Sequence, residues 1–470
     1  MAGFLHRLAI LPLSSAGSVG NDVPVTLIDD TASSGAEPNR SALLRPNRIH
    51  RAWVIAAVTF VTMLGAAAFR SVPGVLMDPL HMEFGWSHAT IGSAMSINMT
   101  LFGLMSPFAA ALMDRFGIRA VVSVALVLVA AGSGLTVFMT SAWQLLLCWG
   151  LLVGVGTGSM SMAFVATVSV RWFVARRGLV SGILTAANAT GQLTFLPVIA
   201  ALTTHHGWRP AAVTVTLAAL AVVPLVLICM RDHPQDVGLQ AYGATESDPG
   251  PARAARSGNS AILALRALFG AARTRVFWLL AASFAICGAT TNGLIGTHFI
   301  PAAQDHGMPV TTAASLLALV GVFDVAGTIA SGWLTDRYDP TVLLLVYYLG
   351  RGLSLMALPS LLAPNTNPST WVFILFYGLD WVATVPPTVA LCRRYFADQA
   401  PIVFGWVFAA HQLGAAVAAA GAGLIRDVEG SYDLAFYLAA MLCAIAAACC
   451  LRAGRSSRIA ARMAGAGGVA

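Results

Sequence analysis

Twelve long apolar runs of about 20 residues each constrain the fold of this chain more than any other feature of its sequence. A helix of that length crosses a bilayer, whereas extended strands would leave unpaired edges in lipid. Only 10% of the residues are charged and the mean hydropathy is +0.77. A soluble domain carries about 25% charged residues. The sequence therefore predicts an all-α membrane protein with twelve transmembrane helices.

The apolar runs set the expected helix positions. We expect helices at 52–76, 88–112, 119–139, 143–168, 177–201, 209–230, 275–300, 313–334, 341–363, 370–392, 402–424 and 432–452.

A repeat divides these helices into two sets of six. The phrase Leu112-Met113-Asp114-Arg115-Phe116-Gly117 returns 222 residues later as Leu334-Thr335-Asp336-Arg337-Tyr338-Asp339. Two further matches share an offset of 223, namely Arg171-Trp172-Phe173 with Arg394-Tyr395-Phe396 and Gly182 with Gly405. The repeat predicts two pseudo-symmetric six-helix bundles, which is typical of transporters that rock one half against the other.

The repeat and the polar stretches give the expected domains. We expect a disordered cytoplasmic N-terminal tail over 1–50, an N-terminal bundle over 51–230, a cytoplasmic linker over 231–274, a C-terminal bundle over 275–452 and a cytoplasmic C-terminal tail over 453–470. The linker contains a short amphipathic stretch, residues 261–269, which predicts an interfacial helix.

The basic residues indicate the topology. All 27 are arginine, and 23 fall in cytoplasmic loops and tails if both termini lie inside. The exceptions are Arg70, Arg209, Arg351 and Arg426. This bias follows the positive-inside rule and predicts a multi-pass protein of the inner (plasma) membrane. The net charge of +7 then reflects orientation, so we expect no nucleic-acid partner.

The sequence gives no sign of a metal or a cofactor. The seven cysteines lie in or beside apolar runs without metal-like spacing, and small apolar packing is their expected role. No nucleotide-binding loop or clustered catalytic set is present, so we expect no enzymatic activity.

Charged residues inside apolar runs need a reason, because each costs at least about 2.5–3.5 kcal/mol at the bilayer centre. Asp324 lies 12 residues before Asp336, or about 18 Å along a helix. Arg351 lies 11 residues after Pro340, or about 16 Å. The two reach a similar depth and are expected to be able to pair. The pair is either structural or functional; in the functional case Asp324 accepts a proton, or Arg351 holds an anionic substrate, when the pair opens.

Other polar residues of the apolar runs are candidates for lining a cavity. Arg70 either extends to the outer surface or grips a carboxylate. Asp380 precedes Trp381 and Pro386-Pro387, which predict a kink whose freed backbone it can bond. His411 and Gln412 occupy the middle of their helix, and Asn188 matches His411 in the first half. Asn292 belongs to a weaker set. The alternative for each is a hydrogen bond within the bundle.

The repeated loop phrase resembles the signature of the major facilitator superfamily. Residues 110–119 are similar to the loop 2–3 signature of that superfamily, residues 332–337 are its echo, and the likeness covers about residues 51–455. Residues 171–182 and Phe323-Asp324 are similar to segments of the monocarboxylate and oxalate/formate transporters within it. Thr328 stands where that group places an arginine, one turn after the aspartate.

The resemblance also implies a gate. A carboxylate such as Asp114 at a helix end can meet the positive N-terminus of a helix from the other half. The implied gating residues are Asp114, Arg115, Arg119, Arg171, Arg176, Arg177, Asp336 and Arg337. The alternative is that the arginines only set the topology.

Together these features predict secondary active transport of a small organic anion, a carboxylate, by rocker-switch alternating access with proton symport or anion exchange. The expected substrate-binding residues are Arg70, Asn188, Asn292, Arg351, Asp380, His411 and Gln412. The expected proton-coupling residues are Asp324, Asp380 and His411. The expected partners are the substrate, protons and lipid, and we expect a monomer. Alternatives are efflux of an apolar or cationic molecule, a membrane enzyme, or a sensor derived from a transporter.

Overall fold

The computed structural model describes residues 50–86, 88–245, 259–362 and 369–466. The expected tail over 1–50 lies outside this description apart from His50. Some side chains within helices are also outside it, Arg70 among them. Each expected apolar run is helical in the described residues, and nine helical segments there have the length and apolarity to cross a membrane.

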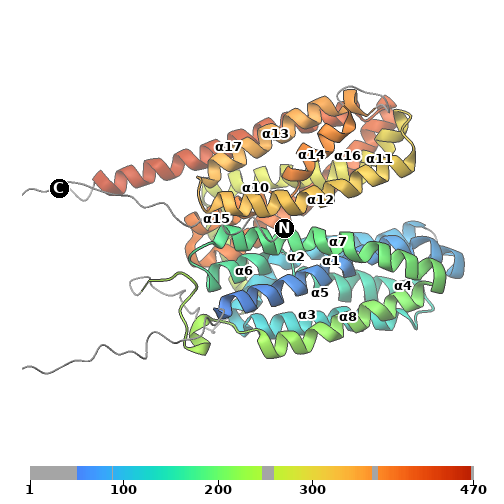
Figure 1. Ribbon diagram of the computed structural model, residues 1–470, viewed down its shortest axis with the longest axis horizontal. Helices are drawn as coiled ribbons and strands as arrows, with labels where there is room; N and C mark the ends of the chain where they lie inside the picture. Colours follow the sequence, from blue (N-terminus) through green and yellow to red (C-terminus); the bar gives the residue numbers. More distant parts are fainter. Residues whose placement is uncertain (1–49, 87, 246–258, 363–368, 467–470) are drawn as a thin grey trace, which may run out of the picture. The chain divides into compact units, whose positions relative to one another are not determined.

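The first half forms one bundle of helices (Figure 1). Its elements are α1 (Arg51–Phe84), α2 (His88–Phe116), α3 (Ile118–Thr136), α4 (Ala142–Leu145), the π-helix η2 (Leu146–Val153), α5 (Gly154–Ser159), α6 (Met162–Trp172), α7 (Arg177–His206) and α8 (Trp208–Cys229). A short 3-10 helix, η3 (Pro234–Val237), and α9 (Ser260–Ala272) follow.

The second half forms the other bundle. Its elements are α10 (Arg275–Gly288), the π-helix η4 (Ala289–Ile295), α11 (Gly296–Asp305), α12 (Val310–Thr335), α13 (Pro340–Leu361), α14 (Thr370–Asp380), α15 (Val385–Phe396), the 3-10 helix η5 (Ala397–Gln399), α16 (Ala400–Glu429) and α17 (Asp433–Ala466). The last helix runs 14 residues past its expected end at 452.

Two membrane-crossing runs break at matching places. The tenth run divides between α14 and α15, and the fourth divides between α5 and α6. Ser161, at the break in the fourth run, lies 223 residues before Thr384 at the break in the tenth. Glycine and serine weaken the helix in the first case and Pro386-Pro387 in the second. Broken helices at corresponding places mark the binding region in many transporter folds.

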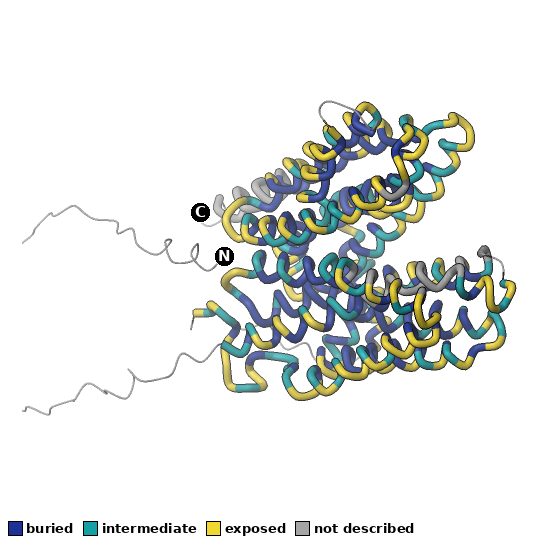
Figure 2. The backbone as a smooth tube through the Cα atoms, turned by 45° about the vertical axis from the view of Figure 1, so that its right-hand side comes forward, coloured by how far each residue is buried: buried dark blue, intermediate teal, exposed yellow. Residues whose placement is uncertain are grey.

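The two bundles share a core at one end only. One hydrophobic cluster fills the first bundle and continues into the second through residues such as Phe284, Phe404 and Phe408. A separate cluster around Phe299, Phe373 and Phe436 fills the remainder of the second bundle. The shared end carries the two repeated phrases, and we call it the signature end. Away from it the bundles diverge (Figure 2).

Candidate functional site

Arg351 on α13 lies at the break between α14 and α15, and its side chain is fully buried. Its Nε donates to Asp380 Oδ2 at 2.7 Å, and its Nη2 donates to the carbonyls of Asp380 and Trp381 at 2.6 and 3.2 Å. Its Nη1 donates to Cys287 Sγ at 3.0 Å and Thr290 Oγ1 at 3.4 Å. A guanidinium has five N–H groups, so all of them are engaged here.

Asp324 on α12 also binds the backbone of the break between α14 and α15. Its Oδ1 accepts from the backbone N–H of Val382 at 3.0 Å and from Thr328 Oγ1 at 2.7 Å. The expected pairing of Asp324 with Arg351 is wrong, because Arg351 forms its ion pair with Asp380. Thr328, which stands where the resembling group has an arginine, gives Asp324 a neutral donor instead of a cation.

The break has a clear local cause, and its backbone is satisfied. Pro386 and Pro387 lack the N–H groups that would bond the carbonyls of Val382 and Ala383 in a continuous helix. Val385 donates to the Val382 carbonyl at 3.0 Å, and Ser331 Oγ donates to the Ala383 carbonyl at 2.5 Å. The expected kink is therefore confirmed. Side chains of α12 and α13 stabilise it, as buried backbone groups require.

His411 and Cys287 complete this buried cluster. The His411 ring packs 4.8 Å from Phe284 and 5.7 Å from Phe408, measured between ring centroids, and its Nδ1 has no hydrogen-bond partner in the structure. Cys287 lies within hydrogen-bonding range of Thr384 Oγ1, at 3.2 Å. The cluster lies inside the second bundle, and Asp324, Arg351 and His411 are each less than 9% exposed. The expectation that they line a cavity between the bundles is not met in this state.

The remaining expected substrate residues lie apart from the cluster. Asn188 and Gln412 are half-buried and Asn292 is exposed. Gln412 on α16 packs against Gly103 of α2, across the boundary between the bundles. Arg70 lies on α1 with its side chain outside the described residues. No group of metal-binding residues occurs in the described ranges.

The first bundle has no matching set of charges. By the repeat offsets, Asp324 corresponds to Phe102, Asp380 to Thr157 and His411 to Asn188. At the break in the fourth run Ser161 Oγ donates to Ser106 Oγ at 2.8 Å, a neutral bond. The buried ionisable groups of the described membrane helices are thus concentrated in the second bundle.

The bundles touch along two seams, and each seam is built on a glycine of the repeat. Gly182 of α7 lies so close to α12 that an added Cβ would be 2.5 Å from the Thr328 carbonyl oxygen. Gly405 of α16 packs equally closely on Pro107 of α2, where an added Cβ would be 2.6 Å from the Pro107 Cα. The two positions predicted from the sequence repeat therefore have one structural role, close crossing between the bundles.

We expect Gly182→Ala to push α7 and α12 apart and to lower the midpoint of thermal unfolding, because overpacking costs about 1–3 kcal/mol. The matched control is Gly421→Ala, since an added Cβ at Gly421 of α16 meets no atom within 4 Å. Thermal unfolding of the purified variants in detergent checks this. Equal midpoints for the two variants would show that the α7–α12 crossing does not need glycine.

Among the described residues, Asp336 makes a polar contact that joins the bundles at the signature end. Asp336, just after α12, accepts from the backbone N–H groups of Gly178 and Leu179 at 2.7 and 2.9 Å. These N–H groups belong to the first turn of α7, where a helix favours negative charge. We call this contact the Asp336 latch. It joins the second half of the chain to the first.

The mirrored latch is missing, and the sequence supplies the reason. The position that matches Gly178 is Pro401, in the first turn of α16, and proline has no N–H to donate. Asp114 instead forms an ion pair with Arg171 of its own bundle. The expectation that Asp114 meets a helix N-terminus of the other half is therefore wrong, and Asp336 makes the contact of that kind.

The expected gating arginines make local contacts. Arg177 donates to the carbonyl of Phe173, and Arg337 lies over the Trp333 ring with its Cζ 3.8 Å from the ring centroid. Arg115 lies over the Phe116 ring in the same way, with its Cζ 4.8 Å from the ring centroid. The Arg119 side chain is exposed, and Arg176 is exposed with a left-handed backbone at φ 60°.

The first turns of α3 and α13 are capped by carboxylates from different sources. Asp339 precedes α13 and accepts from the Thr341 N–H at 2.8 Å. Burial raises the pKa of Asp339, but the hydrogen bonds from Thr341 and Arg394 outweigh it and hold the pKa below its usual value. Gly117, its repeat partner, has no side chain, and Asp232 from beyond α8 accepts from the Arg119 N–H at 3.0 Å instead. Sequence reasoning missed Asp232 because nothing local marks it.

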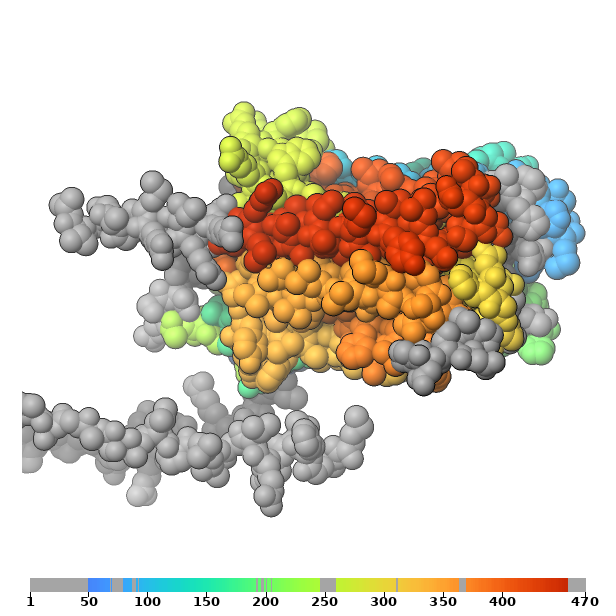
Figure 3. Space-filling model, turned by 90° about the horizontal axis from the view of Figure 1, so that it is seen from above, coloured from blue at the N-terminus to red at the C-terminus, as the bar shows by residue number. Residues whose placement is uncertain are grey.

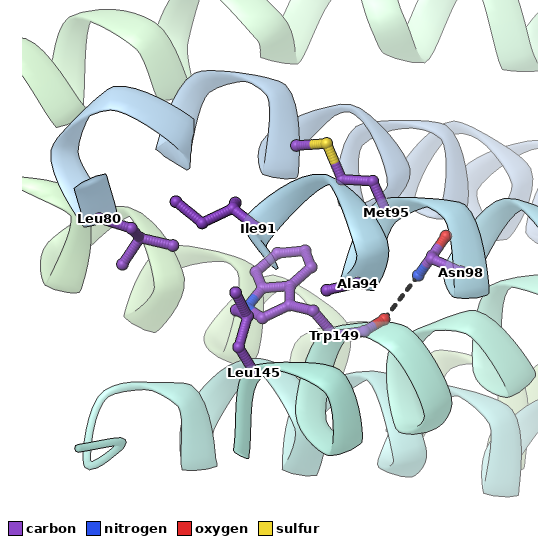
Figure 4. Close-up of a pocket in the computed structure, with 7 residues that line it drawn as sticks. All are labelled: Leu80, Ile91, Ala94, Met95, Asn98, Leu145 and Trp149. Carbon is purple, nitrogen blue, oxygen red and sulfur yellow. Dashed lines mark hydrogen bonds between the residues drawn. The ribbon is translucent and has the colours of Figure 1, made fainter. Parts of the chain in front are cut away.

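A small apolar pocket lies in the first bundle (Figure 4). It is lined by Leu80, Ile91, Ala94, Met95, Asn98, Leu145 and Trp149. Asn98 Nδ2 donates to the Trp149 carbonyl at 2.7 Å, which satisfies a backbone group of the π-helix η2.

The architecture and the paired seams agree with comparisons to known proteins. A family model described as Major Facilitator Superfamily matches residues 56–419. The chain belongs to the major facilitator superfamily. It is therefore a multi-pass membrane protein of a transporter family and not an enzyme.

Relatives within the superfamily have low sequence identity to this chain, but they match it over most of their length. The uncharacterized MFS-type transporter YcxA of Bacillus subtilis (strain 168) is 25% identical over 390 residues, which cover 81% of this chain and 90% of the relative. Monocarboxylate transporter 12-B of Danio rerio is 25% identical over 410 residues, which cover 82% and 83%. The similarity to monocarboxylate transporters expected from the sequence is confirmed.

Solved structures share the fold. A variant of the Escherichia coli fucose:proton symporter FucP has a TM-score of 0.60 at 16% identity and covers 85% of this chain and 99% of its own. The proton:xylose symporter XylE has a TM-score of 0.62 at 16% identity and covers 84% and 94%. The expected twelve-helix fold in two six-helix bundles is confirmed.

Proposed function

We propose that this protein is a proton-coupled secondary transporter of a small monocarboxylate that works by alternating access as a monomer in the inner membrane. Relatives named as monocarboxylate transporters support the substrate class. We infer that the signature end and both termini are cytoplasmic, because the arginines concentrate there.

The observation that carries the proton coupling is an imbalance of buried charge. Two carboxylates, Asp324 and Asp380, share the interior of the second bundle with one guanidinium, that of Arg351. Asp380 is paired, whereas Asp324 accepts only from neutral donors. An unpaired charge in a membrane interior is costly. Asp324 is therefore the group that binds a proton before the bundles move.

Asp324 is placed to link proton binding to the shape of the tenth run. Its Oδ1 holds the N–H of Val382 within the break between α14 and α15. Protonation weakens that acceptor, because hydrogen bonds to a charged carboxylate are about twice as strong as neutral ones. Gain or loss of the proton thus changes how firmly α12 holds the break, and α14 and α15 can shift with it.

The substrate anion would be held by other groups. Arg351 has no free N–H in this state, so its role is to stabilise the break, with Asp380 as its partner. His411 has a buried Nδ1 without a hydrogen-bond partner among the described residues, and it is the candidate group in the cluster that binds the substrate carboxylate. The candidate residues that the substrate contacts on its way to His411 are Arg70 on α1, Asn188, Gln412 and Asn292.

The packing of the two seams supports an assignment of the state. The contacts between α7 and α12 and between α2 and α16 lie toward the signature end, and the bundles diverge beyond them. We therefore assign a state that is closed to the cytoplasm, with the Asp336 latch formed.

We expect Asp324→Asn to abolish uptake driven by a proton gradient while exchange of labelled for unlabelled substrate continues. Asparagine keeps an acceptor for Val382 but cannot carry the proton. The measurement is uptake of labelled small monocarboxylates into proteoliposomes, with and without an inward proton gradient. Gradient-driven uptake by Asp324→Asn at the wild-type rate would rule out this residue as the proton carrier.

Export of an apolar or cationic small molecule is the second candidate. One observation favours it. Arg351 is paired with Asp380, so the carboxylate of Asp324 remains in the second bundle without a cationic partner and could bind a cationic substrate. The same vesicles distinguish the two functions. Proton-driven movement of a lipophilic cation, without movement of any monocarboxylate, would favour export.

A further inference from the structure

Helix α9 has two different faces. Ser260, Ala264, Ala267 and Ala271 follow a helical spacing and are buried. The opposite stripe consists of Ile262, Leu265, Arg266 and Phe269, all exposed, and Phe269 is 64% exposed. Such a helix buries one face in the protein. Its other face is apolar, and exposing that face to water is unfavourable.

The buried face of α9 ties the two bundles together. Ala264 and Ala267 pack with Ala110 and Ala111 of α2, Ala163 of α6 and Ile402 of α16 in one cluster. Trp406 Nε1 of α16 donates to the Ala264 carbonyl at 2.9 Å. The α9 strap, by which we mean Ser260–Ala272 in these contacts, therefore crosses the seam between α2 and α16. This is the seam that lacks a polar latch, because Pro401 cannot donate.

The exposed stripe of α9 carries positive charge as well as apolar area. Arg266 lies within it, and Arg273 and Arg275 follow at its C-terminal end, all exposed. The exposed ring of Trp278 stands next to them, with its Nε1 bonded to the Ala272 carbonyl. In the space-filling view α9 projects as the yellow-green group at one edge (Figure 3).

We propose that this stripe binds the anionic phospholipids of the inner leaflet and that the bound lipid strengthens the α9 strap. Charge complementarity argues for this occupant: arginines and large apolar side chains on one helix face match a negative headgroup and its acyl boundary. A lipid held there keeps α9 against both bundles. The state closed at the signature end is then favoured when anionic lipid is present, whatever the transported substrate.

The test uses the full chain in vesicles of phosphatidylcholine with or without phosphatidylglycerol. Hydrogen–deuterium exchange of peptides covering residues 260–272 and 400–410 reports the strap and the start of α16. We expect phosphatidylglycerol to slow exchange in both peptides. An arginine near an anionic surface contributes about five-fold to binding, so Arg266→Gln with Arg273→Gln is expected to weaken the affinity for phosphatidylglycerol about 25-fold and to remove most of the added protection.

Two further variants separate lipid binding from simple loss of fold. Phe269→Ser keeps every charge and is expected to weaken the lipid effect, because it removes exposed apolar area only. Arg426→Gln, which removes an exposed arginine at the opposite end, is expected to keep it. Exchange that is indifferent to phosphatidylglycerol in the wild type, or an undiminished lipid effect in the double arginine variant, would overturn the proposal.

Discussion

Replacing Arg351 by methionine is expected to destabilise the protein by about 3–5 kcal/mol, the cost of breaking a buried ion pair by removing one partner. The substitution leaves the Asp380 carboxylate buried without its cation. It also frees the carbonyls of Asp380 and Trp381 at the break between α14 and α15. Thermal unfolding of the purified variant in detergent measures the loss.

A matched control and a double variant show which part of the cost is electrostatic. Arg426 forms a similar pair with Asp305 at 2.9 and 3.0 Å, but it is exposed, so Arg426→Met is expected to lower the unfolding midpoint far less than Arg351→Met. Combining Arg351→Met with Asp380→Asn removes the unpaired charge and is expected to recover part of the stability. The carbonyls of the break remain unpaired. If Arg351→Met is as stable as Arg426→Met, Arg351 does not hold the break.

Neutralising the Asp336 latch is the second large expected effect. Asp336→Asn loses the charge that faces the first turn of α7 and weakens two hydrogen bonds. A hydrogen bond to a charged group contributes about 1.5–3 kcal/mol, so we expect the signature end to open at least about tenfold more often. Hydrogen–deuterium exchange of residues 177–185 and 328–338 measures this opening.

The chain supplies its own control for this prediction. Asp114 is the repeat partner of Asp336, but it pairs with Arg171 inside its own bundle. Asp114→Asn is therefore expected to leave exchange along the α7–α12 seam unchanged. Equal exchange in the two variants would contradict a latch formed by Asp336 alone.

The sequence predicted the helices and the bundle arrangement because these depend on apolar length and on a repeat that is readable in one dimension. Gly182 and Gly405 show how far the repeat extends. A fixed offset identified them, and both proved to be close crossings between the bundles. Helix ends were less certain: α1 and α17 continue past their apolar runs to Phe84 and Ala466.

The site was harder to predict because depth along a helix does not give direction around it. Asp324 and Arg351 were placed at one level, but Arg351 faces Asp380 from a third helix. The break beside Asp380 was visible in Pro386-Pro387, whereas the side chains that would bond its carbonyls were not. The residues that were expected to line a cavity are packed inside the second bundle in this state.

The gate was mispredicted for a reason the sequence did contain. Asp114 was expected to meet a helix N-terminus of the other half, and Pro401 removes the donor it needed. The sequence contained no such signal for the cap that Asp232 provides for α3. Arg119 and Asp232 are 113 positions apart, and no local pattern shows that they meet in the fold.

The most direct test of proton-coupled monocarboxylate transport is the proton flux that accompanies uptake of a labelled monocarboxylate into proteoliposomes. The proposal predicts one proton entering with each monocarboxylate anion, at a rate that an imposed membrane potential does not change. It also predicts that this proton flux is lost in Asp324→Asn. Monocarboxylate uptake without proton movement, or uptake that follows the membrane potential, would contradict it.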